Sequence, residues 1–451
     1  MSESNDPVAE FIRAACVPRD TSHASGTLER AESIRAARPE VASANIHTAA
    51  ILGDDQGVRQ FLARDPGDAT AKGGPYGWDA LTHLCFSRYL RLDPARSAGF
   101  LRAAAALLDA GASANTGWQE EIHDPKPTWE SVLYGAAGIA RHPELTRLLL
   151  ERGGDPNDDE TPYHSAESHD NRAVRVLLES GKLSAANLAI ILLRKADCHD
   201  HAGVRLLLEH GADPNRMTQW GRTSLHQAIV RDNALETIEL LLDHGADPTA
   251  VMAGRTAIAI AARRGRGDVL AALERRGVAL GLAGADRLVA ACARDDAAEV
   301  RAATAREKDI VRELLADGGR LLATFAGVGN TNGARLLLDL GIPVASLFPE
   351  GDGYFGIAPR STALHVAAWR ARPATVRLLI ERGAPVGARD GLGRTPLALA
   401  VRACVDSYWT ERRSPESVEA LLRAGASTDG VEFPCGYDAV DALLARHRRS
   451  S

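Results

Sequence analysis

The sequence predicts an all-α solenoid of about eleven helix-turn-helix units joined by hairpin-like loops. Three observations predict this fold. A leucine-rich phrase ending in glycine recurs along the chain, a phrase containing threonine and histidine precedes it, and these repeats occupy nearly all of the 451 residues. A single core stops growing at about 250 to 300 residues, whereas stacked repeats can extend a continuous core.

The leucine-rich phrase marks the second helix of each unit. Its glycines are 28 to 42 residues apart, except for one spacing of 64 that spans two units. Glycine favours the left-handed conformation that ends a helix, so we expect each second helix to stop there. The clearest copies are LLDAGAS (107–113), LLLERGGD (148–155), LLLEHGAD (206–213), LLLDHGAD (240–247), LLIERGAP (378–385) and LLRAGAS (421–427). The marker glycines are Gly111, Gly153, Gly181, Gly211, Gly245, Gly277, Gly341, Gly383 and Gly425.

The second phrase marks the start of the first helix of a unit. It reads Thr-Ser-Leu-His at 223–226 and Thr-Ala-Leu-His at 362–365. Related phrases begin at Asp79, Ser131, Thr161, Thr256 and Thr395. Threonine, serine or aspartate at the N-cap offers an oxygen to the unpaired amides of the first turn, and proline suits the first helical position. We therefore expect these residues to cap the first helices.

These phrases resemble the Thr-Pro-Leu-His-x-Ala signature of the ankyrin-repeat family, whose period is about 33 residues. The resemblance extends over about nine-tenths of the chain. It implies a structural role for the motif histidines His164, His226 and His365, whose rings would hydrogen-bond loop backbone. The runs CVPRDTSHASGTLERAESI and GGPYGWDALTHLCFSRYLRL resemble a group of uncharacterised bacterial ankyrin proteins, which implies no activity.

The predicted domain organisation has three parts. Residues 1–44 are expected to form N-terminal capping helices, residues 45–430 the ankyrin-repeat array, and residues 431–451 a C-terminal cap helix and tail. Repeats that start near residues 188, 284 and 318 lack the signature but keep the pattern of a helix pair.

Composition narrows the classes of partner and the location. The formal charge is −6, from 53 basic and 59 acidic residues, which lacks the basic excess typical of nucleic-acid binding. The N-terminus has no basic leader followed by an apolar run, and no uncharged stretch is long enough for a membrane span. Six scattered cysteines fit a reducing compartment. We expect a cytoplasmic protein with no nucleic-acid or membrane partner and no cofactor.

Insertions and unusual aromatic residues suggest a partner-binding surface. Extra residues occur at 85–100, 346–360 and 403–416. Exposed aromatic residues and arginine are favoured interface anchors, although local packing between loops is the alternative for each aromatic residue. Trp369 could face either the concave groove or the core. The predicted partner-binding residues are Tyr76, Trp118, Trp129, Trp220, Arg222, Tyr354, Phe355 and Trp369.

A histidine- and aspartate-rich segment at residues 123–201 is the strongest candidate for chemistry. Its residues Cys198, His199, Asp200 and His201 could supply half of a zinc or iron site. Adjacent ligands in a loop, however, do not form the spaced pairs of a tetrahedral site, so we predict no metal. The histidines are His123, His142, His164, His169, His199 and His201, and the acidic residues are Asp155, Asp158, Asp159, Glu160, Asp197 and Asp200.

The sequence therefore favours a protein–protein interaction scaffold or adaptor that binds a protein partner through hairpin tips and the concave helix face. We expect no enzyme activity, because serine-nucleophile elbows and glycine-rich phosphate loops are missing from the sequence. Two alternatives stay open: a regulatory protein that binds a small ligand, and a metal-dependent enzyme using residues 123–201. Specificity is expected in the irregular stretches 116–130, 155–201 and 346–360.

Overall fold

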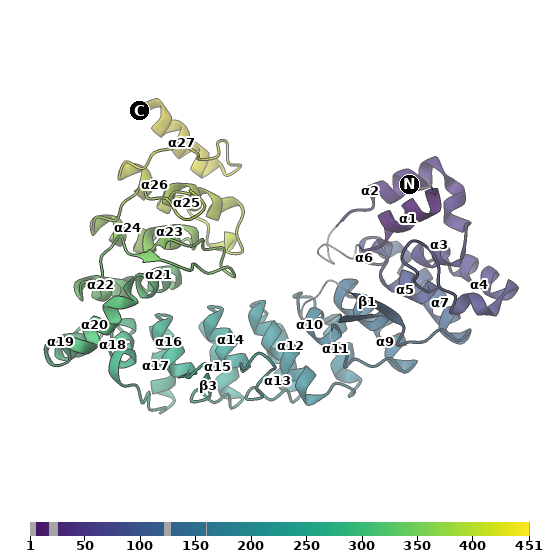
Figure 1. The fold of residues 1–451 in the computed structure, drawn as a ribbon, viewed down its shortest axis with the longest axis horizontal. Coiled ribbons are helices and arrows are strands. Elements are labelled where there is room, and N and C mark those ends of the chain that lie inside the picture. The colour runs from purple at the N-terminus through teal and green to yellow at the C-terminus, as the bar shows by residue number, and fades with distance from the viewer. Residues whose placement is uncertain (1–5, 18–25, 121–127, 159, 451) are drawn as a thin grey trace. The chain divides into compact units, whose positions relative to one another are not determined.

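The computed structural model describes residues 6–17, 26–120, 128–158 and 160–450 (Figure 1). By its backbone contacts the chain divides into two compact units. The first unit contains Met1–Arg231 and Leu240–Asp247, and the second contains Asp232–Glu239 and Pro248–Ser451.

The described residues are mainly helical, as predicted. Helices in the first part of the chain are α1 (Pro7–Ala15), α2 (Glu29–Ala37), α3 (Ile46–Ile51), α4 (Asp55–Arg64), α5 (Ala80–Cys85), α6 (Arg88–Leu92), α7 (Ser97–Asp109), α8 (Val132–Tyr134), α9 (Pro143–Glu151), α10 (Thr161–His164), α11 (Arg172–Glu179), α12 (Ala185–Asp197), α13 (His201–Glu209), α14 (Ser224–Val230) and α15 (Leu235–Asp243). The following helices are α16 (Ala257–Arg263), α17 (Gly267–Arg275), α18 (Gly284–Ala293), α19 (Ala297–Arg306), α20 (Lys308–Ala316), α21 (Gly318–Val328), α22 (Thr331–Asp339), α23 (Ala363–Trp369), α24 (Pro373–Glu381), α25 (Pro396–Val405), α26 (Glu416–Arg423) and α27 (Asp438–Ser450).

Helix pairs stack so that first helices contact first helices and second helices contact second helices (Figure 1). In the first unit α3 packs on α5 and α12 on α14, while α4 packs on α7 and α9 on α11. In the second unit α21, α23 and α25 form one such stack, and α22, α24 and α26 form the other. This arrangement confirms the predicted solenoid of helix-turn-helix units.

Short antiparallel hairpins connect several pairs. They are formed by β1 (Gly117–Glu120) with β2 (Thr128–Ser131), β3 (Val251–Met252) with β4 (Arg255–Thr256), and β5 (Leu347–Phe348) with β6 (Ser361–Thr362). In the central hairpin Val251 pairs with Thr256. Each hairpin leads directly into a first helix, because β2, β4 and β6 end at the residue before α8, α16 and α23 begin.

The predicted N-caps explain where most first helices begin. The side chains of Asp79 and Ser131 accept hydrogen bonds from backbone amides in the first turns of α5 and α8. Thr223 and Thr362 do the same for α14 and α23 in reciprocal capping boxes. Thr256 and Thr395 cap α16 and α25. The prediction was wrong for Thr161, which lies inside α10 and donates its own amide to Asp158 Oδ1 at 2.5 Å.

The marker glycines end the second helices as predicted. All nine have positive φ angles, for example +82° at Gly211 and +105° at Gly341. Apart from the glycine and its two chain neighbours, no described atom lies within 4 Å of the position that a Cβ atom would occupy at either residue. Glycine is therefore needed at these positions for the left-handed backbone and not for space.

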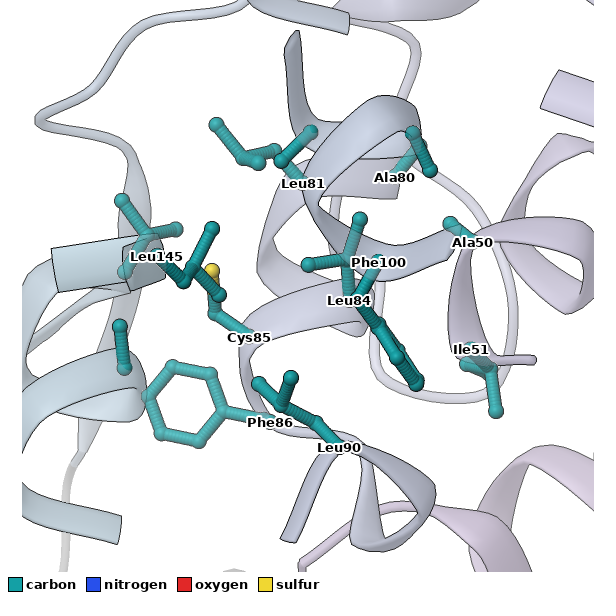
Figure 2. Close-up of a cluster of buried hydrophobic side chains, with 14 of the residues drawn as sticks. Ala50, Ile51, Ala80, Leu81, Leu84, Cys85, Phe86, Leu90, Phe100 and Leu145 are labelled. Carbon is teal, nitrogen blue, oxygen red and sulfur yellow. The ribbon is translucent and has the colours of Figure 1, made fainter. Parts of the chain in front are cut away.

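The core of the first unit forms where the apolar faces of successive helix pairs meet. Figure 2 shows part of it, with side chains from α3, α5, α6, α7 and α9 gathered into one cluster. The labelled side chains are Ala50, Ile51, Ala80, Leu81, Leu84, Cys85, Phe86, Leu90, Phe100 and Leu145, and all are buried. This cluster joins consecutive repeats, which accounts for the need of each repeat for a neighbour.

The repeats without the signature still form helix pairs, as predicted. The pairs are α12 with α13, α18 with α19, and α21 with α22. An additional helix, α20, lies between the last two pairs and was not predicted. No helix in the described ranges is long and apolar enough to cross a membrane.

The chain ends carry helices near the predicted positions. Helices α1 and α2 fall within residues 7–38, and α27 covers Asp438–Ser450. The division into parts 1–44, 45–430 and 431–451 stays a prediction.

Candidate partner-binding surface

A surface of the first unit combines an exposed tryptophan with a network of charged side chains. We call it the Trp220 surface and define it as Tyr163, His164, Glu167, Arg194 and Trp220. These residues come from α10, the turn after it, α12 and the loop before α14. Because α10, α12 and α14 are stacked first helices, the surface spans three consecutive repeats.

Trp220 is the exposed anchor of this surface. Its side chain is 42% exposed and precedes Gly221, whose φ angle is +65°. The Tyr163 ring lies beside it, with ring centroids 5.8 Å apart. The turn thus presents a large apolar group to solvent while one face of that group is supported.

Ring contacts connect Trp220 to the buried core. Tyr163 contacts His164 at a centroid distance of 4.9 Å, and His164 contacts Tyr134 at 5.1 Å. Tyr134 in turn contacts Phe86, which is fully buried, at 5.9 Å. Trp220 therefore stands at the exposed end of a continuous series of packed rings.

His164 is held between two carboxylates. Its Nε2 lies 2.8 Å from Glu160 Oε2, and its Nδ1 lies 2.9 Å from Glu167 Oε2. Burial opposes the charged ring, but the hydrogen bonds to Glu160 and Glu167 outweigh burial and raise the pKa of His164 to about 9. The predicted backbone-binding role of this histidine was therefore wrong, because carboxylates occupy both ring nitrogens.

Arg194 continues the network toward α14. It donates a hydrogen bond to Glu167 at 2.6 Å, and its Cζ lies 4.1 Å from the centroid of the Tyr163 ring. It also pairs with Asp197, which accepts hydrogen bonds from Gln227 and Arg231, each at 2.6 Å. These contacts fix the orientation of Tyr163 and so of the support for Trp220.

A buried carboxyl group lies close to this network. Glu130 is fully buried on β2, and its Oε2 atom has no hydrogen-bond partner among the described residues. Burial, together with the charge of Glu160, raises the pKa of Glu130 to about 8. This carboxyl group therefore keeps its proton at neutral pH in the folded chain.

The structure distributes the predicted site residues over separate places. Trp129 on β2 is exposed, and Tyr76 is half-buried and stacked on Trp78. Arg222 is half-buried and donates a hydrogen bond to Gln227 at 3.0 Å, which places it beside the Trp220 surface.

Two of the predicted anchors are buried, contrary to expectation. Trp118 lies on β1 and stacks on Trp78 at 5.3 Å. Phe355 is only 4% exposed, and its carbonyl accepts a hydrogen bond from Trp369 Nε1. The insertion at 346–360 folds back on the first helices instead of extending into solvent.

The remaining two predicted anchors lie in the same region as Phe355. Tyr354 is half-buried and makes an edge contact with Phe355 at 4.9 Å. Trp369 is buried in the core cluster with Trp409, which resolves the alternative left open between groove and core.

In the candidate metal-binding sequence 198–201, the side chains of Asp200 and His201 contact other parts of the protein. Asp200 caps α13 and pairs with the buried Lys195 at 3.0 Å, and His201 Nε2 contacts Arg205 at 3.0 Å. Within the described ranges, no group of three or more histidine, cysteine or acidic residues is placed to hold a metal ion. His123 and Asp159 lie outside the described residues.

The other motif histidines have structural contacts. His365 Nε2 lies 3.1 Å from the carbonyl oxygens of both Ala388 and Arg394, as the motif implied. His226 Nδ1 contacts the Thr223 hydroxyl at 2.8 Å.

Sequence reasoning missed Tyr163, Glu167 and Arg194 as members of this surface. A signal existed for Tyr163, because it replaces the leucine of the repeat phrase in Thr161–His164. No local pattern identified Arg194, whose partner Glu167 comes from another repeat.

Comparisons with known proteins agree with the observed repeats. A family model described as "Ankyrin repeats (3 copies)" matches residues 192–283, and one described as "Ankyrin repeat" matches residues 360–391. The comparison with curated proteins finds no match. Among solved structures, the human ASB11 ankyrin repeat domain is 20% identical, with 59% of this chain and 98% of that chain covered and a TM-score of 0.25. The matched repeats and the stacked helix pairs together identify the chain as an ankyrin-repeat protein.

Proposed function

We propose that this protein is an adaptor that binds a partner protein through the Trp220 surface. Ankyrin repeats generally serve as protein–protein interaction modules. One observation carries the placement of the interface: the exposed Trp220 ring is supported by Tyr163, which Arg194 holds in turn. A rigid aromatic group that is already positioned before binding loses little conformational freedom, and such groups dominate interface energies.

The proposed partner places an apolar group against Trp220 and polar groups against Glu167 and Arg194. Buried aromatic anchors surrounded by polar contacts are the usual arrangement of a stable interface. The cytoplasmic location, and the lack of nucleic-acid and membrane partners, are further proposals that fractionation and binding assays can test.

Affinity capture with cross-linking from the native cell, followed by binding of the purified partner, tests the proposed interface. Trp220→Ala should weaken binding by at least about tenfold, the usual cost of losing an interface anchor. Leu392→Ala is the control, because Leu392 is also exposed but lies in the second unit. Equal affinities for the Trp220→Ala variant and the unaltered chain would exclude this surface as the contact.

A further inference from the structure

Two turns of the second unit share an Arg-x-Arg sequence that the repeat motif does not require. They are Arg264-Gly265-Arg266, between α16 and α17, and Arg370-Ala371-Arg372, between α23 and α24. In each turn the first arginine follows a first helix, and the second is the N-cap of a second helix. Cationic side chains therefore lie at two helix N-termini, where the helix dipole disfavours them.

Turns from different repeats meet in this part of the second unit. Asn330, in the turn after α21, donates hydrogen bonds to the carbonyls of Gly265 at 2.8 Å and Ala293 at 2.7 Å. Arg370 Nη2 donates to Asp232 Oδ2 at 2.9 Å, although 138 residues separate them. The two Arg-x-Arg turns are thus brought to the same carboxylate.

Asp232 is the most buried of the described acids that pair with these arginines. Burial alone would raise its pKa, but the charges of Arg264, Arg370, Arg266 and Arg372 outweigh burial and lower the pKa of Asp232. Its Oδ1 atom lies 3.8 Å from Arg266 Nη1 and has no hydrogen-bond partner within the described ranges. The guanidinium groups of Arg266 and Arg370 therefore both lie within 4 Å of this buried carboxylate, at 3.8 Å and 2.9 Å.

The nearby acids beyond Asp232 compensate only part of the cluster. Asp268 pairs with Arg266 at 2.7 Å, and Asp352 lies 3.8 Å from Arg264. Both acids are more exposed than Asp232. Among the described residues, these two acids pair with Arg264 and Arg266 and not with Arg370 or Arg372, so the positive charge of the second turn is less fully compensated.

Arg370 and Arg372 are held by contacts with aromatic rings and with a backbone carbonyl. The Cζ atom of Arg370 lies 3.9 Å from the Phe355 ring centroid and 4.7 Å from that of Trp409. Arg372 donates Nε to the Gly327 carbonyl at 3.0 Å. Burial, together with the charges of Arg412 and Arg370, lowers the pKa of Arg372 to about 10. Buried charges of one sign are costly unless a counter-ion joins them.

Several buried N–H groups of these arginines are available to donate hydrogen bonds to an anion. The Nε atoms of Arg264, Arg370 and Arg412 are buried and have no hydrogen-bond partner in the described part of the chain, and Arg370 is 4% exposed. A small cavity of about 20 Å³ is lined by Arg264, Arg370, Asp232 and Phe355 among others. It can admit one oxygen-sized group. A larger anion would therefore insert one oxygen and remain at the mouth.

We propose that this arginine cluster binds a phosphoryl dianion. Several guanidinium groups match the charge and the multiple oxygen acceptors of a phosphoryl group better than a single carboxylate does. The uncapped N-termini of α17 and α24 add backbone amides that favour an anion. The source is either a phosphorylated small molecule or a phosphorylated side chain, since both present the same group.

Thermal unfolding of the full chain in inorganic phosphate tests the site, with sodium chloride at matched ionic strength as the reference. A ligand that binds only the folded state raises Tm in a saturable way. Arg372→Gln should weaken phosphate binding by about tenfold through loss of a charge-assisted contact. Arg335→Gln, at an exposed position on α22, should leave binding unchanged. No saturable shift, or an equal shift in Arg372→Gln and the unaltered chain, overturns the proposal.

Two further variants keep the test independent of folding defects. If Arg372→Gln does not fold, Arg412→Gln takes its place, because Arg412 is only partly buried. Asp232→Asn removes the internal counter-ion, so phosphate should raise its Tm more than that of the unaltered chain. An Asp232→Asn variant that phosphate does not stabilise beyond the chloride reference overturns the proposal. A phosphopeptide that binds more tightly than inorganic phosphate identifies a side-chain source, and equal binding identifies a small molecule.

Discussion

At the scale of single residues, glycine is required at different positions for different physical reasons. Gly211 has a φ angle of +82° and free space where a Cβ would lie. A Cβ at Gly267 would lie 2.0 Å from the carbonyl oxygen of Ala293, a distance that forces the backbone to move. The first glycine is needed for its conformation and the second for close approach between repeats.

Alanine substitutions separate these two requirements. Gly211→Ala should lower the free energy of unfolding by about 1 to 2 kcal/mol, the cost of a left-handed non-glycine residue. Gly267→Ala should cost more, because a backbone clash adds to any loss. Urea denaturation monitored by circular dichroism measures both values. A Gly267→Ala variant as stable as Gly211→Ala would contradict the packing described for α17 and α18.

The pKa values of His164 and Glu130 predict how stability depends on pH. The pKa of His164 is raised from 6.5 to about 9. Its stabilising contribution is therefore complete below pH 6.5 and is lost as the pH rises toward 9. The pKa of Glu130 is raised from 4.5 to about 8, so the protonated carboxyl group favours the folded state at low pH. This contribution to stability is lost as the pH rises from 4.5 to about 8. Both groups therefore predict a lower Tm at pH 9 than at pH 6.5.

Glu130→Gln tests the contribution of the buried carboxyl group. Glutamine is neutral at every pH, so the fall in Tm between pH 6.5 and pH 9 should be smaller in this variant. Part of the fall should persist, because His164 still titrates between Glu160 and Glu167. A pH profile identical to that of the unaltered chain would show that Glu130 is ionised throughout.

At the scale of elements, the two insertions of the second unit form one packed structure. Trp409, from the insertion between α25 and α26, donates its Nε1 proton to the Trp369 carbonyl at 2.6 Å. Phe355, from the β5–β6 hairpin, packs in the same cluster. The insertions thus extend the core of this unit over its first helices.

Two adjacent aromatic residues in the insertion at 403–416 provide a matched pair of variants. Trp409 is 5% exposed, whereas Tyr408 is 91% exposed. Trp409→Ala should lower the free energy of unfolding by about 3 to 5 kcal/mol through cavity formation. Tyr408→Ala should change it by less than about 0.5 kcal/mol, as is usual for exposed positions. Equal values from guanidinium denaturation would contradict the packed insertion.

The sequence predicted the repeated elements but not the folding of the insertions. Thr223 and Thr362 cap helices as expected, because capping depends on residues close in sequence. Phe355 was expected in solvent because its neighbours Gly351 and Gly356 are typical of an exposed turn. Its partners Trp369 and Arg370 come from the following helix and turn, and a local pattern does not reveal which side of a hairpin packs on them.

At the scale of the whole molecule, the candidate surfaces belong to different units. The Trp220 surface lies in the first unit, and the arginine cluster lies in the second. The first was partly predictable, since Trp220 and Arg222 precede a recognisable helix start. The second depends on Asp232 and Arg370, which are 138 residues apart, so no repeat motif could identify their contact.

Repeat arrays transmit stability mainly between neighbouring repeats, because each repeat contacts its neighbours and little else. Trp409→Ala should therefore reduce amide-exchange protection in α23 and α25, which surround the lost side chain. Protection in α5 and α14 of the first unit should stay unchanged, since their core residues come from the first unit. Hydrogen exchange read by mass spectrometry measures each segment separately. An equal loss of protection in α5 would mean that the chain unfolds as a single cooperative body, in which case a ligand at the arginine cluster would also stabilise the Trp220 surface.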